Sequence, residues 1–207
     1  MEFAILSFAS LFIIVDPIGI IPVFLAMTPH NTAAERIKMA GLACVISLLI
    51  LVAFALMGNT LLSIFGITLP AFEIAGGVIL LLVGIDMLQA RRTQVKETYE
   101  EQVEGTSKED IAVTPLAVPM LAGPGAITTV ILLSSQASTW VQRGILVINI
   151  LIVIALTFSI LSFVTLRTRH LNIIVLKIMV RVMGLILTAI AVQFILNGMV
   201  QIPFPGS

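Results

Sequence analysis

The chain has 207 residues and no net charge, and only 11% of its residues are charged, whereas 59% are apolar. Soluble domains contain about 25% charged residues, so this composition excludes a soluble domain and, with a mean hydropathy of +1.16, indicates a polytopic membrane protein. The balanced charge predicts no nucleic-acid partner, and the single cysteine, Cys44, cannot form an intrachain disulfide.

Six apolar stretches are long enough to cross the hydrocarbon of a bilayer, which takes about 20 residues. They cover residues 3–28, 38–57, 71–90, 112–135, 144–166 and 173–199. Residues 61–67 are too few to span and are interpreted as a connecting segment at the interface. Residues 91–110 carry charges of both signs without apolar periodicity, which is typical of a solvated linker between two halves.

The first apolar stretch is interrupted by the sequence DPIGIIP, from Asp16 to Pro22. An aspartate followed by Pro17 is a common helix start, Gly19 lets another backbone come close, and Pro22 disturbs the next turn. Two interpretations of Asp16 stay open. It only caps the second half-helix, or it also faces a polar cavity, where it orients the site, contacts a substrate ammonium or takes up a proton.

The fourth apolar stretch is interrupted in the same way, by Gly123-Pro124-Gly125. Here a glycine stands where the first break has its aspartate, so this break offers backbone N–H groups, which favour anions at a helix start. Thr128 and Thr129 follow. Each hydroxyl is expected either to bind a ligand or to donate to a carbonyl one turn back, and the second role is favoured for either one alone.

The two breaks belong to a repeat with an offset of 107 positions. This offset aligns Pro17 with Pro124, Thr32 with Thr139 and Arg36 with Arg143. Three crossings per half is an odd number, so the second copy must enter the membrane inverted. The sequence therefore predicts an all-α membrane protein of six transmembrane helices, built as two inverted three-helix repeats with broken first helices. The repeats are residues 1–90 and 111–207, joined by a cytoplasmic linker at 91–110.

Basic residues in the connections predict the orientation in the membrane. With the N-terminus outside, the outer connections contain only Arg143. The inner connections then contain Arg36, Lys38, Arg91, Arg92, Lys96, Lys108, Arg167 and Arg169. This bias predicts that both termini lie outside.

A few other polar groups fall within the spans. Asp86 matches Lys177 and Arg181 in depth, which makes a candidate ion pair, most simply a structural one, whereas Glu73 lies near the outer surface with no such partner. Asn149, Gln193 and Asn197 are expected to form hydrogen bonds between helices. No metal-ligand cluster, phosphate-binding loop or nucleophile with its base is present in the sequence, so we expect no enzyme, metal or cofactor.

Two stretches resemble the signatures of the MarC family of integral membrane proteins. They are VDPIGIIPVF, from Val15 to Phe24, and PMLAGPGAITTV, from Pro119 to Val130. The resemblance extends over essentially the whole chain. It implies kinship with LysE-type amino-acid exporters and transport of neutral amino acids such as alanine.

The resemblance and the paired breaks together predict a secondary transporter of small neutral amino acids, working by alternating access in a bacterial or archaeal plasma (inner) membrane. Its partners would be the substrate and the bilayer, and a homo-oligomer is compatible with the sequence. The expected substrate-binding residues are Asp16, Pro17, Gly19, Pro22, Gly123, Pro124, Gly125, Thr128 and Thr129. The alternatives are a channel or exporter for another small metabolite or drug, and a membrane scaffold that transports nothing.

Overall fold

A computed structural model describes residues 2–28, 31–89, 116–117, 120–167 and 173–201 of the chain. Helices make up nearly all of this described part. They are α1 (Glu2–Val15), α2 (Ile20–Met27), α3 (Ala33–Ile64), α4 (Leu69–Gln89), α7 (Pro124–Gln136), α8 (Trp140–Leu166) and α9 (Ile173–Val200). Four of these contain segments long and apolar enough to cross a membrane, namely α3, α4, α8 and Arg181–Gln201 at the end of α9. The prediction of an all-α membrane protein is thereby confirmed, whereas its six crossings and its inverted repeats stay a prediction.

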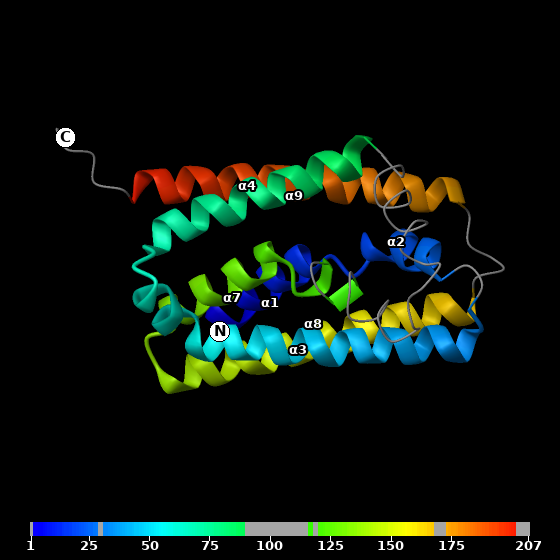
Figure 1. The fold of residues 1–207 in the computed structure, drawn as a ribbon, viewed down its shortest axis with the longest axis horizontal. Coiled ribbons are helices and arrows are strands. Elements are labelled where there is room, and N and C mark those ends of the chain that lie inside the picture. Colours follow the sequence, from blue (N-terminus) through cyan, green and yellow to red (C-terminus); the bar gives the residue numbers. More distant parts are fainter. Residues whose placement is uncertain (1, 29–30, 90–115, 118–119, 168–172, 202–207) are drawn as a thin grey trace.

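The helices lie in three layers along the long axis of the molecule (Figure 1). One outer layer is the antiparallel pair α3 and α8, and the other is the antiparallel pair α4 and α9. The shorter helices α1, α2 and α7 lie between these pairs (Figure 1). The breaks in the sequence therefore fall in the middle layer, where both outer pairs can reach them.

Helix α3 is longer than expected, because residues 61–64 continue it. The interpretation of residues 61–67 as a separate connecting segment is wrong for this part, and only residues 65–68 connect α3 to α4. Gly66 ends the helix with a positive φ of 67°, and the Ile67 N–H donates to the Leu62 carbonyl at 2.9 Å. This is the pattern in which a glycine in the left-handed conformation closes a helix.

Helices α3 and α8 begin with the same capping arrangement. The Thr32 hydroxyl accepts from the Glu35 N–H at 3.3 Å, while the Glu35 carboxylate accepts from the Thr32 N–H at 2.9 Å. Thr139 and Gln142 repeat both bonds, each at 3.2 Å. Each box satisfies two backbone donors that a helix start otherwise leaves free. The two boxes stand at corresponding positions of the sequence repeat and at opposite ends of the molecule (Figure 1).

Glycines let α4 and α9 pack backbone against backbone. A Cβ at Gly77 would lie 2.8 Å from the Ala191 carbonyl oxygen, and one at Gly184 would lie 3.0 Å from the carbonyl oxygen of Gly84. Small residues at such contacts are the usual means of helix association in lipid. The pair α4 and α9 is therefore a closely fitted unit.

Side-chain hydrogen bonds fasten the middle layer to α3 and α8. The Asn149 amide of α8 donates to the Ala4 carbonyl at 2.9 Å and to the Ser7 hydroxyl at 2.7 Å, both in α1. The Ser134 hydroxyl of α7 donates to the Ala55 carbonyl of α3 at 2.6 Å. The prediction for Asn149 is confirmed, whereas Gln193 bonds within its own helix instead, donating to Asn197 at 2.7 Å.

Candidate functional site

The first break forms at Asp16, where α1 ends. The Asp16 N–H still donates to the Phe12 carbonyl at 3.1 Å, but its φ of 47° then turns the chain out of the helix. Non-glycine residues adopt this conformation rarely, aspartate more readily than most, and such strained residues cluster at functional sites. The Asp16 Oδ1 accepts from the Gly19 N–H at 2.9 Å. The carboxylate thus satisfies a donor in the turn that leads into α2, although the regular helix begins only at Ile20.

The second carboxylate oxygen of Asp16 has no such partner. The residue is only 7% exposed, and within the described part of the chain Oδ2 makes no hydrogen bond. Oδ2 lies against Gly19, because a Cβ there would overlap this oxygen and would also lie 2.8 Å from the Met87 Cε of α4. A buried carboxylate that is only half satisfied costs free energy, so this oxygen is available to a cation or a proton.

The second break precedes α7. The Ala122 N–H donates to the carbonyl of Ala117, five residues back, at 2.9 Å, which is a wide π-type turn. Gly123 is then extended, with a φ of −71° and a ψ of 168°, and Pro124 opens α7. Gly123 contributes no side chain to cap the helix. Pro124 has no N–H, and the Ile127 N–H donates to the Gly123 carbonyl at 3.0 Å. Gly125 and Ala126 therefore carry the N–H groups of the first turn that no capping side chain serves.

The two threonines of α7 bond within their own helix. The Thr128 Oγ1 donates to the Pro124 carbonyl at 2.8 Å, and the Thr129 Oγ1 donates to the Gly125 carbonyl at 2.8 Å. A hydroxyl that donates its hydrogen still has lone pairs that accept. Gly76 of α4 packs directly on Thr128, so α4 covers this face of α7 as it covers Gly19 in the first break.

The two breaks lie in the same layer, near the middle of the long axis (Figure 1). Helix α1 contacts α7, and α7 also contacts α3 and α4. The flanking residues Val15, Leu121, Ala122 and Ala126 are buried. The structure thus places Asp16, Pro17 and Gly19 in one break and Gly123 to Thr129 in the other. Apolar side chains pack around both breaks. The side chain of Pro22 lies outside the described part.

The candidate ion pair is not formed where the structure describes it. Asp86 and Arg181 are both exposed. The side chain of Lys177 lies outside the described part of α9. A pair between Asp86 and Lys177 accordingly stays a prediction.

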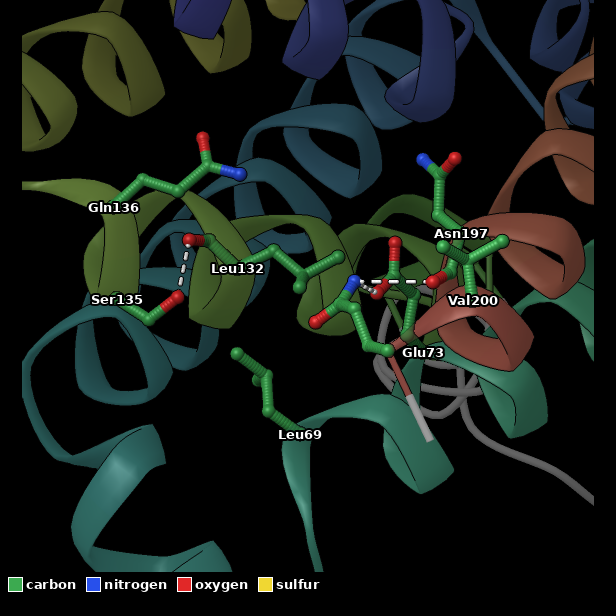
Figure 2. A pocket seen from close by; sticks show the side chains of 8 residues that line it. Leu69, Glu73, Leu132, Ser135, Gln136, Asn197 and Val200 are labelled. Carbon is green, nitrogen blue, oxygen red and sulfur yellow. Dashed lines mark hydrogen bonds between the residues drawn. The ribbon is translucent and has the colours of Figure 1, made fainter. Parts of the chain in front are cut away.

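A cavity of about 450 Å³ lies away from the breaks, among the start of α4, the end of α7 and the end of α9 (Figure 2). It contains Glu73, which is 4% exposed and whose Oε2 accepts from the Gln201 Nε2 at 3.1 Å. The sequence predicts that Glu73 lies near the outer surface but does not predict a partner for it. The sequence feature that indicates a partner for Glu73 is the pair of amides, Asn197 and Gln201, at the end of the last apolar stretch.

Comparisons with known proteins agree that the chain is a membrane protein. The model of the MarC family of integral membrane proteins matches residues 1–203. The UPF0056 membrane protein MJ0972 of Methanocaldococcus jannaschii is 38% identical over 97% of this chain and 88% of its own length. YvbG of Bacillus subtilis is 37% identical over 96% of this chain and 94% of its own, and YhcE of Escherichia coli is 34% identical over 96% and 92%. Both are also described as UPF0056 membrane proteins.

No solved structure matches the chain. The match to the family model covers both breaks, both capping boxes and all the described helices. The chain therefore belongs to the MarC family of integral membrane proteins.

Proposed function

We propose that this protein is a secondary transporter of small neutral amino acids, in which the two breaks form the substrate site. The observation that carries the proposal is Asp16, whose backbone has a positive φ and whose buried carboxylate is bonded through only one oxygen. Ionisable groups at this depth of a membrane protein are expensive and usually functional. Broken helices that meet near the midplane are the usual substrate sites of secondary transporters.

The chemistry of the two breaks complements a zwitterion. The Asp16 Oδ2 would receive the ammonium of the substrate. The N–H groups at the start of α7 would receive its carboxylate, because Gly123 leaves them uncapped. Neighbouring side chains pack closely on Gly19 and Gly125, so on this proposal the site opens only when the helices move, and a small substrate such as glycine or alanine needs the smallest opening.

Alternating access follows from an inverted repeat. The matching capping boxes at Thr32 and Thr139, at opposite ends of the molecule (Figure 1), support two copies of opposite orientation. On this proposal α1 and α2 together form the first crossing, and residues 112–135 form the fourth, giving six. The proposed location is the plasma (inner) membrane, with both termini outside.

A membrane scaffold that transports nothing is the second candidate. The observation that favours it is the dense packing around the breaks, where Leu121 and Ala122 are fully buried. A transporter in an occluded conformation would pack in the same way, so flux measurements are needed to separate the two.

Reconstitution in liposomes tests the proposal. Purified protein with an imposed proton gradient is expected to move radiolabelled alanine, glycine or threonine with saturation. Asp16→Asn keeps the size of the side chain but removes its charge, and is expected to lower flux at least tenfold. The matched control is Asp86→Asn, the same change at an exposed carboxylate of α4, which is expected to retain flux.

The results separate the candidates. Absence of flux for all three amino acids would overturn the substrate class. Full flux in Asp16→Asn, with an unchanged pH response, would remove Asp16 from the site. Flux of unrelated metabolites without saturation would identify a channel.

A further inference from the structure

The cavity at the ends of α4, α7 and α9 has the size of a ligand site. Its volume of about 450 Å³ lies within the range of about 300–1,000 Å³ that small-molecule pockets occupy. Helix α7 starts at the second break and reaches the cavity with Leu132 and Ser135. At about 1.5 Å per residue, the cavity lies roughly 15 Å from that break. It is therefore distinct from the site proposed above.

The cavity is acidic and rich in amides. Its polar lining consists of Glu73, Ser135, Gln136, Asn197 and Gln201. None of the described residues that line it is basic. The Glu73 carboxylate is buried and accepts a hydrogen bond from Gln201, a neutral donor. A buried carboxylate that lacks a counter-charge gains free energy when a cation binds beside it.

The positions of the side chains that line the cavity indicate which shape of ligand would fit it. Glu73 and Asn197 lie on one side of the cavity, Ser135 and Gln136 lie on the other, and Leu69 and Leu132 lie between them (Figure 2). The Ser135 hydroxyl already donates to the Leu132 carbonyl at 2.7 Å, so it can only accept, whereas the Gln136 amide can both donate and accept. A matching ligand has a cationic end, a short apolar middle and, optionally, a polar far end.

We infer that this cavity binds small primary ammonium compounds, with the ammonium at Glu73 and the carbon chain against Leu69 and Leu132. An ammonium carries N–H donors that suit both the carboxylate and the neighbouring amide oxygens. The competing structural explanation is that the bond from Gln201 to Glu73 only fastens the end of α9 to α4. That explanation predicts a role in stability and no binding.

Calorimetric titration of the purified protein in detergent distinguishes these explanations without any transport assay. Three probes are used, propylammonium chloride, tetramethylammonium chloride and sodium propionate. Only propylammonium is expected to bind with saturation, because tetramethylammonium has no N–H donor and propionate has the wrong charge. Glu73→Gln, which is nearly isosteric, is expected to weaken propylammonium binding at least tenfold, whereas Asp86→Asn on the same helix is expected to leave it unchanged.

A second variant keeps the test decisive if Glu73→Gln fails to fold. Leu132→Trp leaves the carboxylate in place but fills the cavity, and it is expected to abolish binding. Unchanged binding in Leu132→Trp, or in a folded Glu73→Gln protein, would overturn the inference. Loss of binding in Asp16→Asn with retention in Glu73→Gln would also overturn it, since the probe would then occupy the break instead.

Discussion

At the scale of single residues, Asp16 and Gly19 depend on each other to form the first break. The aspartate needs its positive φ to turn the chain, and its carboxylate then lies directly against the glycine. Any side chain at Gly19 would displace either the carboxylate or Met87 of α4. Position 19 therefore requires glycine because no space is available there for a Cβ.

We predict that Gly19→Ala destabilises the protein by about 1–3 kcal/mol, the usual cost of overpacking a filled site. The measurement is the free energy of unfolding in detergent. Gly144→Ala in α8 is the matched control, because nothing lies within 4 Å of a Cβ at Gly144. The control is expected to gain about 0.5–1 kcal/mol from replacing a helical glycine. Equal effects at both positions would contradict the spatial argument.

At the scale of helices, polar contacts across the layers decide how the middle layer is held. Asn149 is buried and donates to two groups of α1, whereas α4 and α9 associate through glycines. The contacts thus differ in kind and in place: those of Asn149 join an outer layer to the middle layer, and those of the glycines hold α4 and α9 to each other within one outer layer. The first are directional and hydrogen-bonded, and the second depend on close backbone contact.

A double-mutant cycle on Asn149→Ala and Ser7→Ala measures the directional attachment. We expect a coupling energy of about 0.6 kcal/mol, the average for hydrogen bonds between helices in membrane proteins. Gln193→Ala is expected to change stability little, because Gln193 is exposed and bonds within its own helix. A coupling energy near zero between Asn149 and Ser7 would show that their bond does not contribute to the attachment of α1.

How far the sequence predicts the molecule differs between elements. The break at Gly123-Pro124 and the local bonding of Thr128 follow from residue chemistry alone, because proline and back-bonding hydroxyls act within one turn. The sequence does not predict the continuation of α3 through residue 64, because the end of the helix depends on the conformation of Gly66. Nor does the sequence predict the cavity at Glu73, because its lining comes from three helices that only tertiary packing brings together.

At the scale of the whole molecule, the orientation in the membrane is open to a direct test. Arg36 lies in the first turn of α3, and Arg167 directly follows α8, at the same end of the molecule (Figure 1). Arg143 lies in the first turn of α8, at the opposite end. The positive-inside rule places the first end in the cytoplasm.

Labelling with a membrane-impermeant maleimide in intact cells measures this orientation. Cys44 is buried and is first replaced by alanine, and single cysteines are then introduced as Ser138→Cys and Ala34→Cys, both at exposed positions. Ser138→Cys is expected to react in intact cells, and Ala34→Cys only after lysis. The reverse pattern would show that both termini face the cytoplasm.

The hydrogen bond from Gly19 to Asp16 has a mechanical consequence. Backbone bonds across the first break are few, since Pro17 has no N–H, and the carboxylate supplies one of the restraints on the angle between α1 and α2. A charged acceptor holds a donor more strongly than a neutral one. Protonation of the carboxylate would therefore weaken this hydrogen bond and so relax the restraint on the angle between α1 and α2. Asp16 would thereby convert a change of charge into a change of bending stiffness, within a single residue.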